Sequence, residues 1–325
     1  MMEHFLQSVV VVIPIIFVLA FGFFAGKTNQ FNGNDKAIPI INELVLNFAL
    51  PCSLFVGTIS ISRVQLIDDL VLFFSLLITL LIAYLFSLFL AKFVFKRNIV
   101  ESSIAGLAVS FSAGPFYGPA LLGSLYGVSS GVAISMISVV INVFIVPLAT
   151  IIIKVDLLKS NTTANKPEVS IYKMVGRAIY QAIFKTPFVW APLLAFILVF
   201  LNIKTPSVMN NSLELIGKAT AGIAVFVAGM TIAVNKFKLT GEVLLISLLK
   251  SIGLPVLFFI VALALHMAKG TPIFNQGLLL AALPSGPMIV LLATKYKQYQ
   301  EEASSILAIT TLGMIITVTA LIMII

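Results

Sequence analysis

Two Gly-Pro pairs give this chain its clearest chemical signal. Gly114-Pro115 and Gly286-Pro287 each interrupt a long apolar segment. Proline has no N–H and crowds the carbonyl four residues earlier, so a helix is disrupted there. Each interruption leaves two half-helices with free ends. The N-terminus of a half-helix offers N–H groups and a partial positive charge, which together can bind an anion.

Further prolines extend both interruptions. Pro119 follows the first Gly-Pro pair and Pro284 precedes the second. Inside a bilayer, carbonyls that lose their donors are tolerated only when they are buried in protein or line a wet cavity. The carbonyls of Phe111, Pro115, Leu280 and Leu283 are the ones that should lose them. We therefore expect a central binding site formed by Ser112, Ala113, Gly114, Pro115, Phe116, Gly118, Pro284, Ser285, Gly286 and Pro287.

Three polar residues elsewhere in apolar segments are further site candidates. Lys250 is the only charged residue deep in such a segment, eight residues past Glu242. Intramembrane cations usually face a cavity or a partner, which suggests that Lys250 attracts a substrate carboxylate. The alternative is that its ammonium extends back to the membrane surface. Asn47 and Asn142 are weaker candidates, because such residues commonly join helices to one another.

The composition identifies the protein class. The chain has 325 residues, of which 60% are hydrophobic and 10% charged, and its mean hydropathy is +1.14. Soluble domains contain about 45–50% apolar and about 25% charged residues. These values exclude a cytosolic enzyme, a nucleic-acid-binding protein and a disordered scaffold. The fold class predicted is an all-α polytopic membrane protein.

Ten apolar segments are long enough to cross a membrane, which takes about 20 residues. They are continuous runs rather than alternating ten-residue segments, so a transmembrane β-barrel is not expected. The fourth and ninth are the interrupted ones. The segments lie at about 5–26, 38–57, 70–91, 99–126, 131–153, 183–203, 213–234, 243–268, 273–295 and 303–325.

The basic residues predict the orientation. The net charge is +8, and fifteen of the twenty Lys and Arg residues lie in the odd-numbered connections, against four in the even-numbered ones. Positive charge marks the cytoplasmic side. The prediction is a multi-pass protein of the cytoplasmic membrane with both termini facing outward. The basic excess then reflects topology and not binding to nucleic acid.

An internal repeat predicts the architecture. A shift of 172 residues places Gly114-Pro115 on Gly286-Pro287 and Gly57 on Gly229. The expected units are a first repeat at 1–153, a cytoplasmic linker at 154–172 and a second repeat at 173–325. Each repeat has five spans, so the second must cross the membrane in the opposite sense. Inverted repeats with broken helices are characteristic of secondary transporters, which bind substrate near the midplane.

Other chemistry is not indicated. No HExxH, GxSxG or paired mid-span aspartates suggest an enzyme. The only cysteine, Cys52, excludes a disulfide framework, and His4 and His266 are too far apart for a metal cluster. No cofactor or metal is therefore expected. No carboxylate lies near the middle of a span, which disfavours a sodium or proton antiporter and fits an anionic substrate.

Several motifs resemble those of the auxin efflux carrier family, which includes plant PIN-type carriers and bacterial malate or malonate permeases. The segments that carry the resemblance follow the family's order and cover the chain from the first span to the last. They are Ala-Ala-Leu-Pro-Ser-Gly at 281–286 with Leu-Ala-Thr-Lys-Tyr at 292–296, Phe116 and Gly118 with Leu-Tyr-Gly at 125–127, and Leu-Pro-Cys-Ser-Leu-Phe at 50–55.

The resemblance implies ten helices in two inverted repeats, with broken helices four and nine crossing at the binding site. It also implies a transport domain that moves against a scaffold domain, commonly in a homodimer. Two departures from the family pattern matter: its crossover asparagine aligns with Ala113, and its following proline aligns with Ala120. Substrate contacts of that asparagine therefore cannot be assigned here, although Ser112 is a candidate to replace it.

The function predicted is secondary transport of small organic anions, mono- or dicarboxylates such as malate or malonate, by alternating access. The expected partners are this substrate and the lipid bilayer. Two alternatives remain: a sodium-coupled symporter of the bile-acid type, and a non-transporting receptor with a transporter fold. The sequence leaves proton coupling and the direction of transport open.

Overall fold

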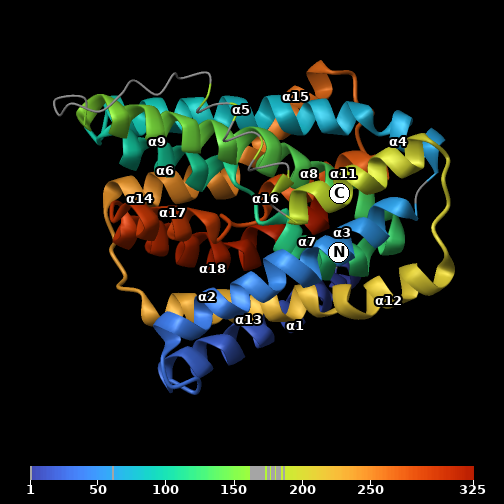
Figure 1. Cartoon of the computed structure of the whole chain (residues 1–325), viewed down its shortest axis with the longest axis horizontal. Coiled ribbons are helices and arrows are strands. Elements are labelled where there is room, and N and C mark those ends of the chain that lie inside the picture. The colour runs from blue at the N-terminus through green and yellow to red at the C-terminus, as the bar shows by residue number, and fades with distance from the viewer. Residues whose placement is uncertain are drawn as a thin grey trace.

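The computed structural model describes residues 2–60, 62–161 and 187–325, together with residues 173, 176, 180, 184 and 185. Its described part consists of helices, drawn in Figure 1. The first half contains α1 (Met2–Lys27), α2 (Asn34–Leu44), η1 (Val45–Ala49), α3 (Leu50–Ile59), α4 (Arg63–Asp68), α5 (Leu70–Phe93), α6 (Ile99–Ser110), α7 (Gly114–Tyr126), η2 (Gly127–Ser129), α8 (Ser130–Val139), η3 (Val140–Ile145) and α9 (Val146–Asn161).

The second half repeats this pattern of long helices and short interruptions. It contains α11 (Pro187–Phe200), α12 (Ser207–Gly217), α13 (Ala219–Val234), α14 (Gly241–Leu248), η4 (Leu249–Gly253), α15 (Leu254–Ala264), α16 (Pro272–Ala282), α17 (Met288–Tyr296) and α18 (Gln300–Ile324). The predicted linker at 154–172 begins inside α9, which continues to Asn161, and its remainder lies outside the described residues.

Six stretches of the described chain are long and apolar enough to cross a membrane. They coincide with six of the ten predicted spans: Lys36–Ile59, Leu70–Phe93, Ser130–Leu157, Ser207–Val234, Gly241–Ala264 and Gln300–Ile324. The other four predicted spans contain shorter apolar helical stretches: Ile16–Lys27 within α1, Ile99–Ser110, Trp190–Phe200 and Pro272–Ala282. Two of these, α6 and α16, are short because the chain is interrupted where the Gly-Pro pairs predict.

Three long helices contain a π-helical segment that ends two residues before a proline. η1 precedes Pro51, η3 precedes Pro147 and η4 precedes Pro255. In each case the residue just before the proline donates its N–H to the carbonyl five residues earlier. The proline ring crowds the carbonyl four residues earlier, so the wider turn relieves that clash. Asn47, Asn142 and Lys250 each lie in one of these segments.

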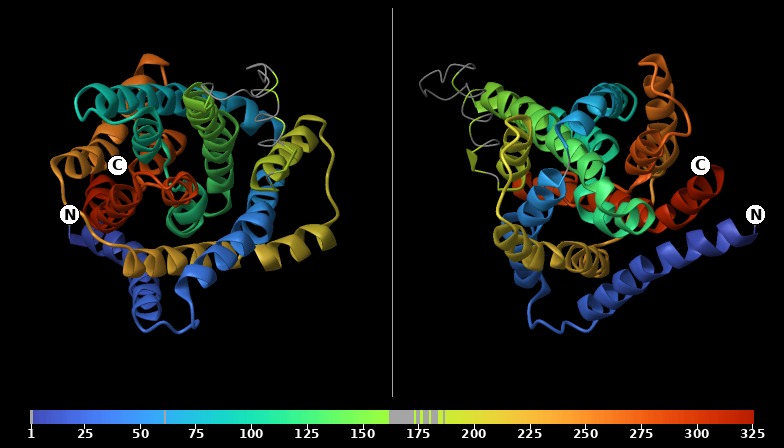
Figure 2. Two further views of the ribbon diagram at one scale, coloured as in Figure 1. Left: turned by 60° about the vertical axis from the view of Figure 1, so that its left-hand side comes forward. Right: turned by 90° about the vertical axis from the view of Figure 1, so that its right-hand side faces the viewer.

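The helices form three layers around the interruptions. In Figure 1, α5, α9 and α15 lie on one side, α1, α2, α12 and α13 lie on the other, and α6, α16, α17 and α18 lie between them. The turned views of Figure 2 show the same arrangement. Contacts of α6 with α5 and of α16 with α15 connect the middle layer to one neighbour, and contacts of α18 with α1 and α13 connect it to the other. This places both interruptions inside the protein.

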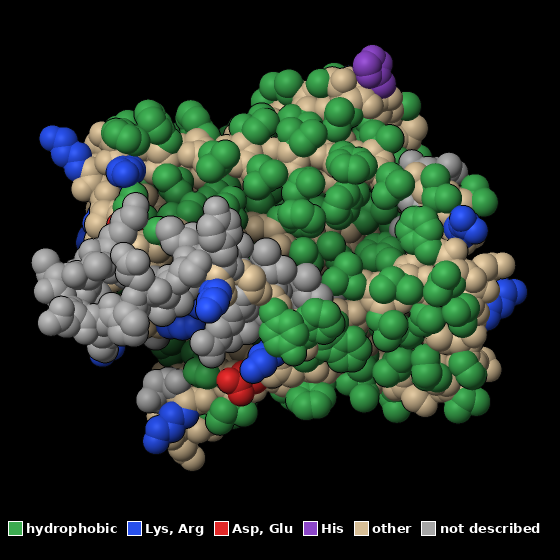
Figure 3. Space-filling model, turned by 45° about the horizontal axis from the view of Figure 1, so that its top comes forward, with side chains coloured by type: hydrophobic (Ala, Val, Ile, Leu, Met, Phe, Trp, Pro, Cys, Tyr) green, Lys and Arg blue, Asp and Glu red, His purple; other side chains and the backbone are tan. Residues whose placement is uncertain are grey.

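The outer surface is apolar, as a bilayer requires. On α5, large side chains at Phe74, Ile78, Ile82, Leu85 and Phe89 are exposed. Figure 3 shows hydrophobic side chains over most of the face that carries α5 and α15, with several Lys and Arg side chains toward its ends. Exposed apolar patches of this extent mark contact with a membrane or a partner.

Candidate functional site

The two interruptions lie side by side and pair with each other. Ser112 and Ser285 form an isolated antiparallel β-bridge. The N–H of Ala113 donates to the carbonyl of Pro284 at 2.9 Å, and the N–H of Gly286 donates to the carbonyl of Phe111 at 3.1 Å. The breaks predicted in the fourth and ninth apolar segments are therefore one structural unit.

The two serines cap each other's half-helices. The Ser112 hydroxyl donates to the carbonyl of Leu280 in the last turn of α16, and the Ser285 hydroxyl donates to the carbonyl of Ala108 in the last turn of α6. Leu280 needs this donor because Pro284, four residues later, has no N–H. Both serines are fully buried. The two serines lie at the breaks, as predicted, and they also satisfy the carbonyls at the ends of α16 and α6.

The glycines of the interruptions allow close packing. A Cβ added to Gly286 would lie 2.0 Å from the ring of Phe111, and one added to Gly114 would lie 2.7 Å from Cγ2 of Ile137. At Gly118 the contact with Ile134 would be 3.0 Å. The first two distances are shorter than non-bonded atoms accept, so larger residues would push the interruptions apart.

A small enclosed cavity lies beside the interruptions. The first residues of α7 and the residues that begin α17 both contribute to its wall, so the N-termini of two half-helices meet there. Its volume is about 10 Å³, close to the space of one water molecule, so a carboxylate substrate needs the walls to move. The lining residues are Leu46, Leu50, Phe111, Pro115, Phe116, Asn142, Pro287 and Met288.

The three isolated polar candidates have different surroundings. Asn142 lines the cavity and donates its side-chain amide to the carbonyl of Ser138 at 2.8 Å. Asn47 has an exposed side chain and is absent from the cavity wall, although its neighbour Leu46 is part of it. Lys250 is fully buried, and its ammonium donates to the carbonyl of Ala281 at 3.3 Å. The alternative in which Lys250 extends to the membrane surface is therefore wrong.

A larger cleft opens at the far end of α7. Its volume is about 480 Å³, within the range of small-molecule sites. The cleft lies between α3 and α12 on one side and α7 and α8 on the other. Pro119, one turn past the first Gly-Pro pair, forms part of its wall, and the ion pair of Glu214 with Lys218 (3.1 Å) lies at its edge. The cleft thus approaches the small cavity along a single half-helix.

Sequence reasoning missed a polar support of the second interruption. The N–H of Ser285 donates to the hydroxyl of Thr310 on α18 at 3.2 Å. Thr310 is buried and donates in turn to the carbonyl of Ile306 in its own helix. The only sequence signal was a pair of threonines, Thr310 and Thr311, in an apolar span, which does not distinguish a support from ordinary helix contacts.

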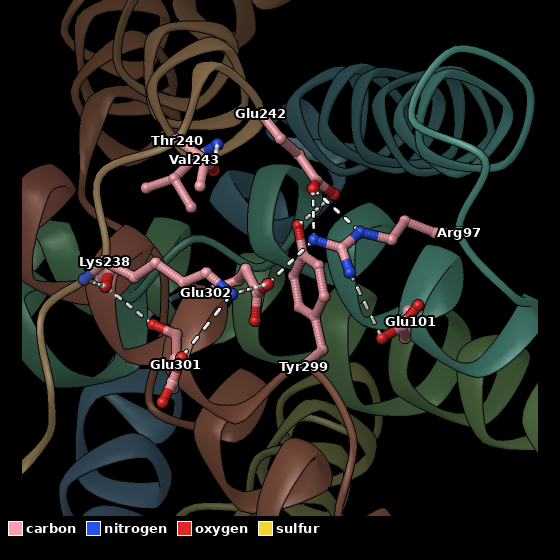
Figure 4. Close-up of polar contacts among 10 residues, drawn as sticks. Arg97, Glu101, Lys238, Thr240, Glu242, Val243, Tyr299, Glu301 and Glu302 are labelled. Carbon is pink, nitrogen blue, oxygen red and sulfur yellow. Dashed lines mark hydrogen bonds and ion pairs between the residues drawn. The ribbon is translucent and has the colours of Figure 1, made fainter.

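A charged cluster at the basic end was also missed (Figure 4). The Arg97 guanidinium contacts the carboxylates of Glu242 at 2.8 Å and Glu302 at 2.9 Å, and its ring-face contact with Tyr299 measures 5.3 Å. Tyr299 donates its hydroxyl to Glu242 at 2.8 Å, and Lys238 contacts Glu302 at 3.0 Å. The cluster joins the start of α6 to the starts of α14 and α18. The only sequence feature that pointed to this cluster was the presence of glutamates in the first turns of two predicted spans.

Contacts within the charged cluster shift the pKa values of its members. The hydrogen bond to Glu242 raises the pKa of Arg97, and the one to Glu302 raises the pKa of Lys238. Burial is the main cause that raises the pKa of Tyr299, and the charge of Glu242 adds to it. Both cations therefore stay charged, and the phenol stays protonated, over the physiological range.

Comparison with known proteins gives consistent matches over the whole chain. A family described as membrane transport protein matches residues 7–322. The chain is 31% identical over 307 residues to "Uncharacterized transporter YfdV" of Escherichia coli (strain K12), covering 94% of this chain and 93% of that protein. It is 23% identical over 311 residues to "Putative malonate transporter" of Rhizobium meliloti (strain 1021), covering 95% and 93%.

Proposed function

Because the chain belongs to the family of membrane transport proteins, the auxin efflux carrier family that its motifs resemble, we propose that it is a secondary transporter of small organic anions. Mono- and dicarboxylates such as malonate or malate are the substrates proposed. Alternating access around the paired interruptions is the mechanism. Membership of a transporter family also argues against an enzyme.

One observation carries the proposal: the N-termini of two half-helices meet at one cavity. Phe116 near the start of α7 and Met288 at the start of α17 line it, together with the amide side chain of Asn142. No Asp or Glu belongs to the lining residues of the described chain. Helix N-termini favour anions, and an acid-free wall does not oppose them.

The full architecture proposed is ten spans in two inverted five-helix repeats, at 1–153 and 173–325. The ends of the two interrupted helices support it. α6 ends at Ser110 and α16 ends at Ala282, 172 residues later, which is the shift that aligns the two Gly-Pro pairs.

The substrate class rests on chemistry and on one relative. The name of the Rhizobium meliloti protein refers to malonate, a short dicarboxylate. A dicarboxylate would place one carboxylate at the half-helix N-termini. Ser112, Ala113, Gly114, Pro115, Phe116, Gly118, Pro284, Ser285, Gly286 and Pro287 would shape the site, with Asn142 at its wall and Asn47 close by on η1. The cleft beside Pro119 would be the route from the outer side.

The cellular setting proposed follows the distribution of basic residues. The protein would be a multi-pass protein of the cell membrane with both termini outward, since the connections rich in Lys and Arg would face the cytoplasm. A homodimer and coupling to protons remain part of the proposal through the family resemblance alone.

Uptake into proteoliposomes tests the proposal. Wild-type protein should accumulate radiolabelled malonate or malate without added sodium, and Gly286→Leu should abolish uptake because of the clash with Phe111. Gly222→Leu on α13 is the matched control, since no atom lies within 4 Å of a Cβ placed there and Gly222 lines neither the small cavity nor the cleft. Size-exclusion profiles verify that both variants fold.

Three outcomes would contradict the proposal. Near-normal uptake by Gly286→Leu would refute the site assignment. A strict sodium requirement would favour the bile-acid-type symporter. Binding of an anion without any uptake in either direction would favour a receptor with a transporter fold.

A further inference from the structure

The fully buried Lys250 ammonium replaces a missing backbone donor. In an unbroken helix the carbonyl of Ala281 would accept from the N–H of Ser285, four residues later. That N–H is instead directed to the hydroxyl of Thr310. The Lys250 side chain donates to the carbonyl of Ala281 in its place, at 3.3 Å. Lys250 thereby connects η4 to the C-terminal end of α16, next to the second interruption.

The first interruption has no counterpart of this ammonium. The shift of 172 residues that aligns the two Gly-Pro pairs places Ile78 on Lys250 and Val109 on Ala281. The reciprocal serine caps are present at both interruptions, whereas the cation is present at one. An interruption can therefore form without such a side chain, and the presence of Lys250 needs its own explanation.

The electrostatic surroundings give that explanation. The C-terminal ends of α6 and α16 both terminate at the interruptions, and each carries a partial negative charge. No carboxylate of the described residues forms an ion pair with Lys250: the ion pairs in this part of the chain involve Arg97, Lys218 and Lys238. A buried charge is retained only when something compensates for its lost hydration. Here the available partners are a helix end and any anion that binds nearby.

We propose that Lys250 is a positioning residue that supplies a fixed cation to the paired interruptions. Its ammonium holds the C-terminal end of α16 in place. It also places an amino group one hydrogen bond away from the second interruption, where it can attract the carboxylate of a bound substrate. The first role is independent of the proposed function, and the second rests on it.

Chemical rescue tests the first role. Lys250→Ala removes three carbons and the nitrogen, which is the outline of n-propylammonium. In the absence of any organic anion, saturating n-propylammonium should raise the melting temperature of detergent-solubilised Lys250→Ala by about 3 °C. It should not change the melting temperature of wild type or of Lys250→Met, whose side chain fills the space. n-Propanol, which has a similar shape and no charge, should not stabilise Lys250→Ala.

Two results would overturn this role. Equal stabilisation by n-propanol would mean that Lys250 only fills space. The role would also be overturned if Lys250→Ala melts at the wild-type temperature and n-propylammonium does not change that temperature, because the contact with Ala281 would then not stabilise the protein. If Lys250→Ala cannot be purified in folded form, the melting temperature of Lys250→Met is compared with that of wild type. An unchanged melting temperature in Lys250→Met also overturns the role.

Malonate binding tests the second role separately. Lys250→Ala should bind malonate at least tenfold more weakly than wild type, and n-propylammonium should restore most of the affinity. Equal malonate affinity in wild type and in Lys250→Ala without amine would overturn the electrostatic role alone. A wild-type protein that binds no organic anion would instead contradict the proposed function, and the melting experiment would still decide the first role.

Discussion

Ser112 and Ser285 face each other across the centre of the protein, and each hydroxyl donates to the last turn of the half-helix that precedes the other. This exchange solves a problem set by the interruptions: Pro284 has no N–H to donate to Leu280, and the N–H of Ser112 turns to Ser110 where α6 ends, which leaves Ala108 without its usual donor. Carbonyls at the ends of α6 and α16 have lost their usual donors, and no water of the bilayer core can replace them. Each interruption supplies the donor that the other lacks.

Ser112→Ala and Ser285→Ala should destabilise the protein to a similar extent. Each leaves one buried carbonyl unsatisfied, which costs about 1–3 kcal/mol. Thermal melts in detergent measure the effect, and the double variant should lose less than the sum because both bonds hold the same bridge. Ser124→Ala is the control: its exposed hydroxyl donates only to carbonyls of its own helix. A loss confined to one serine would contradict the reciprocal arrangement.

Gly286→Ala should impair transport through its contact with Phe111. The added methyl would lie 2.0 Å from the Phe111 ring, so the ring or the backbone must move. Overpacking of this kind costs about 1–3 kcal/mol. Phe111→Leu in the same chain should recover part of the uptake and stability, whereas Phe111→Leu added to the control Gly222→Ala, where no atom lies within 4 Å of the new Cβ, should raise neither. Failure of the suppressor would place the defect elsewhere.

Arg97→Gln should destabilise the protein through the carboxylates that it leaves behind. Glu242 and Glu302 are both 5% exposed. Without Arg97, Glu302 keeps its contact with Lys238, but Glu242 is left with the Tyr299 hydroxyl alone, and a buried carboxylate that loses its cation costs about 3–5 kcal/mol. Replacing both acids by Gln in the Arg97→Gln background should restore much of the melting temperature. Arg63, which is exposed, provides the control substitution. A triple variant as unstable as Arg97→Gln would refute the charge argument.

Tyr299 should make stability depend on pH in the alkaline range. Its pKa in the folded protein is raised above its value in the unfolded chain, about 10, because the phenol is buried beside Glu242. Its contribution is therefore complete below about pH 10, and it falls as pH rises further, because the unfolded chain then releases the proton first. Tyr299→Phe should melt earlier at neutral pH but lose less on going to pH 11. An identical alkaline slope in both proteins would contradict this assignment.

The helical fold and the positions of the breaks followed from the sequence, and the contacts between the breaks did not. Gly-Pro pairs and apolar runs are local signals, so the ends of α6 and α16 could be predicted to within a few residues. The donor for Leu280 comes from Ser112, far away in the chain, and no local pattern encodes that pairing. The partner of Lys250 was unpredictable for the same reason: its acceptor, the carbonyl of Ala281, carries no side-chain signal.

The ion cluster illustrates a different limit. Arg97, Glu242 and Glu302 each lie at the end of an apolar run, where a charge is ordinarily solvated. Only the packing of α6 against α14 and α18 brings them together and buries the acids. The π segments were equally hidden, since a proline inside a helix can be accommodated by a kink as well as by a wider turn.

The pairing of the interruptions also has a consequence for biosynthesis. Ser112 leaves the ribosome 173 residues before Ser285. At about 5–20 residues per second, the first interruption is in the membrane for roughly 10–35 s before its complement exists. During that interval the carbonyl of Phe111 and the hydroxyl of Ser112 have none of their final partners. Both groups reach their final partners only after α16 and the second interruption have been made, so the centre of the protein is completed late in synthesis.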